Sequence, residues 1–166
     1  MTRFTSKSAS DLVSMIYNDS GDTFSTQPVT ARFETYKLLN QLLNSHRKVI
    51  RAMGSDFIRI IDSLAATERD PRNLMLVFTM IEVILNEWDQ EAITETSEEL
   101  YETLQRYFPI SFRPKPNDPV TITANDLILK LRGCFAAYSG FAPSLFPDLI
   151  QRLDDPNRLN AKVNYL

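Results

Sequence analysis

The chain has 166 residues, of which 43% are hydrophobic and 23% charged, so it is long enough for one domain with a buried core and has the composition of a soluble globular protein. Its net charge of -3 argues against a nucleic-acid groove, because such grooves need clustered Lys and Arg to neutralise phosphates. We expect no membrane span, since no uncharged apolar run approaches roughly 18 residues, and no secretory signal, since the first four residues lead into Ser and Lys and not into an apolar stretch. The single cysteine fits a reducing compartment, and we expect a cytoplasmic and nuclear location.

Apolar residues recur at helical spacing along almost the whole chain, with little strict alternation. This periodicity predicts about seven helices and no strand outside one loop, over residues 10–17, 28–44, 49–64, 71–87, 96–108, 123–135 and 142–153. Residues 18–27 are expected to form a polar loop. Gly54 and Ser55 can interrupt the third helix, because glycine in a helix interior costs about 1 kcal/mol relative to alanine.

Two of the helix starts carry capping signals. Asp70 can accept backbone amide hydrogen bonds as the N-cap, and Pro71 fits the first helical position. Thr123 opens a segment that resembles a capping box, with Asp126 in place of the usual Glu or Gln. The helix that begins at Pro71 is apolar on nearly every side, which predicts that neighbouring helices sandwich it. The sixth helix is expected to bury Leu127, Ile128, Leu131, Cys134 and Phe135.

These elements predict an all-α fold of HEAT-like stacked antiparallel helix pairs, which is a segment of an α-solenoid. Identity between the pairs is weak, so a compact irregular bundle stays open as an alternative. We interpret residues 1–166 as one helical-repeat segment of a longer solenoid, because the helix that restarts at Asp155 and Pro156 cannot bury its apolar face alone. An exposed apolar end of this kind also predicts self-association.

The residues that could carry chemistry are few and scattered. His46 falls at a polar helix end with no nucleophile or orienting carboxylate beside it, and Cys134 lies on an apolar helical face. We therefore expect no enzyme, no cofactor and no metal site. The acidic residues from Glu87 to Glu102 could hold a divalent cation, but a solvated turn between helices is the preferred interpretation. Trp88 among them is either a partner anchor or a wedge between helices.

The segment 109–122 is a long irregular loop that contains four prolines. Long loops in compact domains are often functional, and prolines pre-order an extended backbone, which lowers the entropy lost on binding. The candidate partner-binding residues in this loop are Ile110, Phe112, Arg113, Lys115, Asn117 and Asp118. The alternative is a rigid strap in which Ile110 and Phe112 fold back over the helices, and both roles stay open.

An ordered series of short segments carries a resemblance to a known family. The segments are Glu68–Leu74, Tyr107–Ile110, Pro116–Pro119, Ile122–Leu129, Phe141–Pro143 and Ala161–Val163. Together they resemble the N-terminal HEAT-repeat domain of the methyl-methanesulfonate-sensitivity (Mms/Met) protein family of the cytosolic iron–sulfur assembly machinery. The resemblance covers nearly the whole chain from about Val29.

The resemblance implies a non-catalytic adaptor that helps to deliver iron–sulfur clusters to apoproteins of DNA replication and repair. The implied partners are subunits of the iron–sulfur targeting complex, apo iron–sulfur helicases and repair factors of the TFIIH type. The implied mechanism is colocalisation, in which clients and cluster donors are brought together and the chain itself does not bind iron. A general HEAT-repeat interaction scaffold in transport or in transcription and repair regulation, unrelated to iron–sulfur assembly, is the alternative.

Overall fold

The computed structural model describes residues 6–20, 23–111 and 122–154, and in these residues every regular element is helical. The α-helices are α1 (Ser6–Ser20), α2 (Val29–Ser45), α3 (Arg47–Arg51), α4 (Ser55–Ala65), α5 (Pro71–Glu87), α6 (Gln90–Arg106), α7 (Ala124–Ala137) and α8 (Ala142–Asp154). Two short 3₁₀ helices, η1 (Phe24–Thr26) and η2 (Ser139–Phe141), lie between them. The expected all-α class is confirmed for the described residues.

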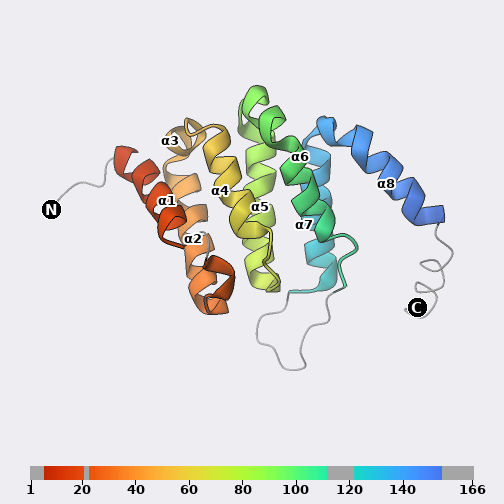
Figure 1. Ribbon diagram of the computed structural model, residues 1–166, viewed down its shortest axis with the longest axis horizontal. Helices are drawn as coiled ribbons and strands as arrows, with labels where there is room; N and C mark the ends of the chain where they lie inside the picture. Colours follow the sequence, from red (N-terminus) through yellow and green to blue (C-terminus); the bar gives the residue numbers. More distant parts are fainter. Residues whose placement is uncertain (1–5, 21–22, 112–121, 155–166) are drawn as a thin grey trace.

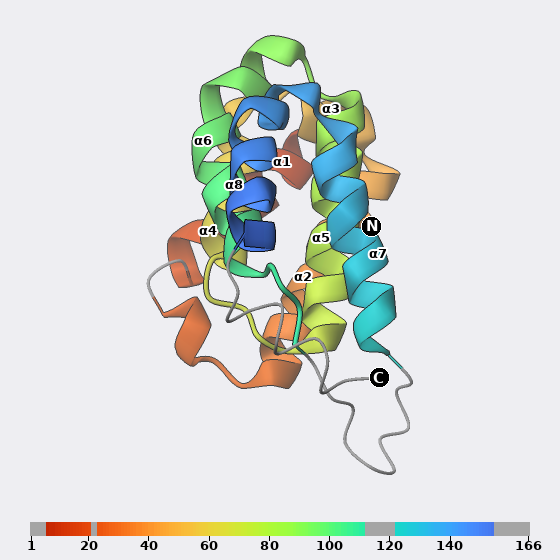
Figure 2. The ribbon, with the colours of Figure 1, turned by 90° about the vertical axis from the view of Figure 1, so that its right-hand side faces the viewer.

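The helices form two layers that run side by side along the molecule (Figure 1). We call α1, α4, α6 and α8 the A layer and α2, α5 and α7 the B layer. In the B layer α5 contacts both α2 and α7, and in the A layer α4 contacts α6. Successive long helices alternate between the layers and reverse direction, as Figures 1 and 2 show. The expectation of stacked antiparallel helix pairs is therefore confirmed, in preference to an irregular bundle.

Helix α5 is the central element, in contact with α2, α4 and α7. This sandwiched position explains why it is apolar on nearly every side. Its buried residues are Asn73, Leu74, Val77, Phe78, Met80, Ile81, Ile84 and Leu85. The helix begins as the sequence predicts, because the Asp70 carboxylate accepts hydrogen bonds from the backbone N–H of Arg72 at 3.0 Å and of Asn73 at 3.4 Å, and Pro71 occupies the first turn.

The turn between α4 and α5 is organised by Glu68, whose carboxylate is buried. It accepts hydrogen bonds from Arg32 Nε at 2.9 Å and Nη2 at 3.0 Å, and from Asn73 Nδ2 at 3.0 Å. The backbone N–H groups of Arg69 and Asp70 donate to it at 2.8 and 2.9 Å. Burial raises the pKa of Glu68, but the hydrogen bonds from Arg32 and from these other donors outweigh burial and lower the pKa to about 2. One carboxylate thus ties α2, the turn and α5 together.

Two tyrosines satisfy carbonyl groups at the end of α4. Tyr36 of α2 donates to the carbonyl of Leu64 at 2.8 Å, and Tyr107, just after α6, donates to the carbonyl of Ala65. The last carbonyls of a helix lack partners within the helix, so these bonds complete the end of α4. Burial raises the pKa of both phenols well above the ordinary value, which keeps them protonated as donors.

The region expected as one third helix is split into α3 and α4. Gly54 between them has φ +57° and ψ -132°, a backbone conformation that residues with a Cβ rarely adopt. The chain turns at this glycine, so that α3 contacts α1 and α2 while α4 contacts α5 and α6. The split raises the number of described α-helices to eight, where the periodicity indicates about seven.

Other helix boundaries also differ from the expected ones. Helix α6 begins at Gln90, not at Thr96, because its buried Ile93 and Thr96 extend the apolar stripe toward the N-terminus. Helix α1 covers Ser6–Ser20 and not only residues 10–17. It therefore extends into the expected polar loop 18–27, which also contains η1. The expected helix restart at Asp155 lies outside the described residues.

We predict that Glu68→Gln lowers the free energy of unfolding by about 3 to 5 kcal/mol, because it leaves the guanidinium of Arg32 buried without a carboxylate. Urea unfolding followed by circular dichroism measures this loss. The matched control is Glu34→Gln, which breaks the exposed ion pair with Lys37 and should cost less than about 1 kcal/mol. Equal costs for the two variants would contradict a special role for Glu68.

The contribution of Glu68 should also depend on pH. Its pKa falls from 4.5 to about 2 on folding, so the ionised form stabilises the fold above about pH 4.5, and this stabilisation is lost as the pH falls toward 2. The shift corresponds to about 3 kcal/mol. We expect the stability difference between the parent chain and Glu68→Gln to shrink over that interval when urea unfolding is repeated at each pH. A difference that stays constant with pH would contradict the lowered pKa.

Candidate functional site

The ends of the proline-rich loop are both fixed to the helical stack. At its start Ile110 is half-buried and packs against the core, as the strap interpretation expects for this residue. At its end Thr123 and Asp126 form a full capping box: the Thr123 hydroxyl accepts from Asp126 N at 3.2 Å, and Thr123 N donates to the Asp126 carboxylate at 2.8 Å. The other candidate partner-binding residues, Phe112, Arg113, Lys115, Asn117 and Asp118, lie outside the described residues.

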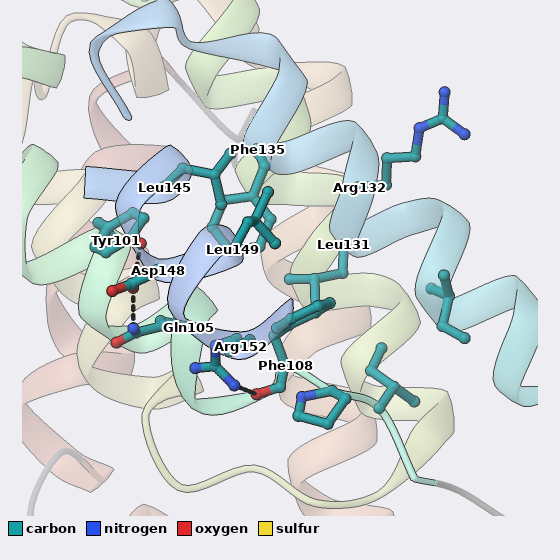
Figure 3. A pocket seen from close by; sticks show the side chains of 13 residues that line it. Tyr101, Gln105, Phe108, Leu131, Arg132, Phe135, Leu145, Asp148, Leu149 and Arg152 are labelled. Atoms are coloured by element: carbon teal, nitrogen blue, oxygen red, sulfur yellow. Dashed lines mark hydrogen bonds between the residues drawn. The ribbon is translucent and has the colours of Figure 1, made fainter. Parts of the chain in front are cut away.

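A groove with a volume of about 330 Å³ opens beside the start of this loop, between α6, α7 and α8 (Figure 3). Most of its lining is apolar and comes from separate parts of the chain. The main apolar residues that line it are Tyr101, Ile110, Leu131, Phe135, Leu145 and Leu149. Its size is at the lower end of the range of small ligand pockets, which suits one or two large side chains.

One wall of the groove is polar and joins α8 to α6. The Asp148 carboxylate accepts hydrogen bonds from the Tyr101 hydroxyl at 2.6 Å and from the Gln105 amide. Arg152 donates to the carbonyl of Phe108 at 3.2 Å, and its guanidinium lies over the Phe108 ring at 5.1 Å from the centroid. Burial, with the hydrogen bond to Asp148, raises the pKa of Tyr101 to about 12. The phenol therefore stays protonated and acts as a donor that positions α8.

The groups in the groove do not form a reacting pair. Asp148 is occupied by two donors, and Tyr101 holds its proton at neutral pH. Cys134 is buried nearby, where its Sγ–H donates to the carbonyl of Phe78 at 3.2 Å and burial raises the pKa of the thiol. His46 lies at the junction of α2 and α3, far along the stack from the groove (Figure 1). This arrangement can bind an apolar group but offers no activated nucleophile.

The acidic run from Glu87 to Glu102 lies mostly on α6 and not in a turn. Three of its members form ion pairs with arginines from the preceding helices: Arg47–Glu87 at 2.6 Å, Arg51–Asp89 at 2.7 Å and Arg59–Glu95 at 2.7 Å. Among the described residues, no three His, Cys, Asp or Glu side chains lie together in a way that could hold a metal ion. Glu87, Asp89 and Glu95 thus serve as contacts between helices.

Trp88 is an interhelical wedge, which decides between the two interpretations that the sequence leaves open. Its side chain is buried and stacks on Phe57 of α4, with the ring centroids 5.8 Å apart and the planes 20° apart. A residue buried in this way cannot anchor a partner without local unfolding.

The end of the stack exposes apolar side chains on both layers. Phe146, Ile150 and Leu153 of α8 are about 60% exposed, and Ile128 and Leu129 of α7 are 45% and 53% exposed. The prediction that Ile128 is buried is therefore wrong. Ile128 is exposed because α7 is the last described helix of the B layer and has no described neighbour on its far side. No described helix is both long enough and apolar enough to cross a membrane.

Comparison with known proteins gives a consistent result. Residues 1–166 match the family described as "Dos2-interacting transcription regulator of RNA-Pol-II". The chain is 36% identical over 158 residues to the MMS19 nucleotide excision repair protein homolog of Danio rerio, which is 95% of this chain and 15% of that protein. The Homo sapiens homolog is 34% identical over 143 residues (84% and 13%), and the Drosophila melanogaster protein is 30% identical over 132 residues (80% and 14%). The chain thus spans only a small part of the length of these relatives.

We predict that Asp148→Ala loosens α8, because the carboxylate is the acceptor for both Tyr101 and Gln105. The backbone amides of α8 should exchange with deuterium about tenfold faster, while those of α5 should be unchanged. Asp154→Ala, at the exposed end of the same helix, is the control and should leave the exchange rates as they are. Equal rates in the two variants would show that Asp148 does not hold α8.

Proposed function

The chain belongs to the family described as Dos2-interacting transcription regulator of RNA-Pol-II, and on that premise we propose that it is a non-catalytic adaptor segment that acts in DNA repair by binding other proteins. Its relatives are named as nucleotide excision repair proteins, which supports the link to repair. The chain covers 15% of the zebrafish relative, so the proposal concerns the part that this segment plays.

The observation that best supports an adaptor is that polar side chains join the helices to one another. In the described residues, the carboxylates of Glu68, Asp148 and Glu82 accept hydrogen bonds that join helices. Bonds of this kind fix neighbouring helices relative to one another, and a scaffold with fixed helices holds its binding elements in one arrangement at low entropic cost. This is the physical requirement for a protein that acts by bringing others together.

The finer proposal is that the adaptor serves the delivery of iron–sulfur clusters to cytosolic and nuclear apoproteins of DNA replication and repair. It is supported by the ordered series of segments that resembles the iron–sulfur assembly family. Its partners would be targeting-complex subunits, apo iron–sulfur helicases and repair factors of the TFIIH type, and its location cytoplasmic and nuclear. The chain would bind proteins and leave cluster chemistry to them. Two further expectations stay predictions: that residues 1–166 form one helical-repeat segment, and that this segment self-associates.

A second candidate is regulation of transcription by a scaffold that does not serve iron–sulfur assembly. The description of the matching family, which names a transcription regulator of RNA polymerase II, favours this candidate. The two candidates differ in their partners and not in the physical mode of action, so binding experiments can separate them.

We place client recognition in the proline-rich loop, at Ile110, Phe112, Arg113, Lys115, Asn117 and Asp118. The proposal is supported by the fixed ends of the loop, because Ile110 packs on the core and the capping box of Thr123 holds the start of α7. The sequence between these ends is rich in proline, and proline fixes its own backbone φ, so a segment of this composition is expected to lose less entropy when it binds. An apolar side chain beside positive charge then suits a partner surface with an apolar and acidic character.

The test is a pull-down with the tagged 166-residue chain that compares the parent with Phe112→Ala plus Arg113→Ala. We expect purified targeting-complex subunits or apo iron–sulfur helicase to bind the parent and to lose at least tenfold in affinity for the loop variant, as for a small binding hot spot. The matched control is Phe146→Ala plus Arg132→Ala, which removes the same side-chain types from exposed positions on α8 and α7. Circular dichroism verifies that all variants remain helical.

Capture that is equal in the parent and in the loop variant would move recognition from the loop to the helical faces. Capture of RNA polymerase II regulators, with no capture of iron–sulfur assembly proteins, would favour the second candidate. No capture of either class would contradict client binding by this segment.

A further inference from the structure

The seam between α4 and α6 in the A layer contains an ionisable side chain, Asp62. The two helices lie side by side and contact each other directly (Figure 1). On α4, Asp62 follows Ile58 by four residues and precedes Ala65 by three, which places all three on one face of the helix. Ile58 and Ala65 are buried, so Asp62 occupies a place in a stripe that is otherwise apolar.

The facing stripe of α6 is almost closed to solvent. Thr96, Leu100 and Thr103 recur at helical spacing, and each is at most 2% exposed. The Thr96 hydroxyl is satisfied within its own helix, where it donates to the carbonyl of Ala92 at 3.0 Å. Thr103 lies within hydrogen-bonding reach of Asp62. The carboxylate of Asp62 therefore faces a buried surface and not open solvent.

Asp62 is poorly compensated for a carboxylate in such a place. Its Oδ1 atom is buried and has no hydrogen-bond partner among the described residues. The buried carboxylate of Glu68, by contrast, accepts hydrogen bonds from Arg32, from Asn73 and from two backbone amides. A buried charge whose hydrogen-bonding capacity is not filled destabilises the packed state. The seam thus carries a cost that the turn at Glu68 does not.

The charged groups of α6 that face Asp62 do not neutralise it. Glu99 and Glu102 repel its ionised form, and Arg106 attracts it. The attraction is shared, because Arg106 also pairs with Glu102 at 3.8 Å, and both of these side chains are more than half exposed. Burial is the largest influence and raises the pKa of Asp62 above its ordinary value, with the two glutamates, against the opposing effects of Thr103 and Arg106.

The other charged groups on the elements around Asp62 are engaged elsewhere. On α5, which also packs against α4, they are Arg72, Glu82 and Glu87, and these pair with Asp70, Lys130 and Arg47 respectively. On α4 itself Arg59 pairs with Glu95, and Asp56 is exposed in the first turn. Tyr107, at the end of α6, stays protonated and donates to the carbonyl of Ala65.

From these observations we infer that the seam between α4 and α6 is a pH-sensitive joint of the stack, which loosens when Asp62 is ionised and tightens when Asp62 is protonated. The ionised form places an incompletely bonded charge between two packed helices, and protonation removes that charge. The joint is therefore in its looser state near neutral pH. This inference is independent of the proposed function, because it concerns how two helices are held together and not which partner is bound.

The direction of the effect follows from the folded and unfolded forms of the same carboxyl. A carboxyl whose pKa is raised on folding costs nothing below the pKa of the unfolded chain, and its cost appears as the pH rises through the pKa of the folded chain. Acidification thus stabilises the joint, which is the opposite of the effect at Glu68, where the pKa is lowered.

The test uses the 166-residue chain and hydrogen–deuterium exchange of the α6 amides, expressed as protection factors between about pH 4 and pH 7. Asp62→Asn removes the charge and keeps the shape of the side chain. The matched control is Asp56→Asn, which removes the same charge from an exposed position on the same helix. The amides of α7, which belongs to the B layer, are the internal reference.

We expect the α6 protection factors of the parent chain to fall several-fold, relative to those of α7, as the pH rises toward neutrality. Asp62→Asn should keep the higher protection at every pH, and Asp56→Asn should follow the parent. The carbon-13 chemical shift of the Asp62 carboxyl, titrated in the parent chain, is a second readout that needs no variant to fold. Its midpoint should lie above the ordinary value for aspartate and should move down in Glu99→Gln plus Glu102→Gln.

Three results would overturn the inference. The first is equal protection of α6 in the parent and in Asp62→Asn at neutral pH. The second is lower protection in Asp62→Asn at every pH, which would show that the carboxylate holds the seam together. The third is a carboxyl midpoint at or below the ordinary value for aspartate.

Discussion

One buried carboxylate determines how the central helices of this stack meet. Glu68 lies in the turn between α4 and α5 and receives hydrogen bonds from Arg32 of α2, Asn73 of α5 and two backbone amides. A charge buried in this way is tolerated only when its hydrogen-bonding capacity is filled, so the three elements must keep one relative placement. Since α5 also contacts α7, the position of α5 helps to set the position of α7, and residues of α7 line the groove.

Much of the fold follows from sequence patterns, and the departures have local causes. The start of α5 is predictable because an aspartate suits the N-cap and the proline directly after it suits the first helical position. The sequence indicates a break at Gly54 only weakly, since a cost of about 1 kcal/mol does not by itself end a helix and the positive φ of Gly54 belongs to the packing of α3 and α4 on different neighbours. The start of α6 at Gln90 is not evident from the sequence, because the first turns of that helix are acidic and polar and Ile93 is their main apolar residue.

The candidate site was less predictable than the fold. The sequence points to the proline-rich loop from its composition, but no pattern indicates that Tyr101, Gln105 and Asp148 meet across two helices, because such contacts join residues that are distant in the chain. The same holds for the ion pairs that join arginines of α3 and α4 to Glu87 at the end of α5, to Asp89 and to Glu95 of α6. The one available signal was that α8 is apolar on two sides, with Leu145 and Leu149 on one and Phe146 and Ile150 on the other, which is typical of a helix with more than one neighbour.

The burial of Cys134 has a consequence for the reactivity of the folded chain. The chain contains a single thiol, which is sealed between α7 and α5 with its proton committed to the carbonyl of Phe78. The thiolate, not the protonated thiol, is the form of cysteine that binds metal ions and reacts with oxidants and disulfides. Because burial also raises the pKa of this thiol, Cys134 stays protonated and is unreactive toward metal ions, oxidants and disulfides while the chain is folded.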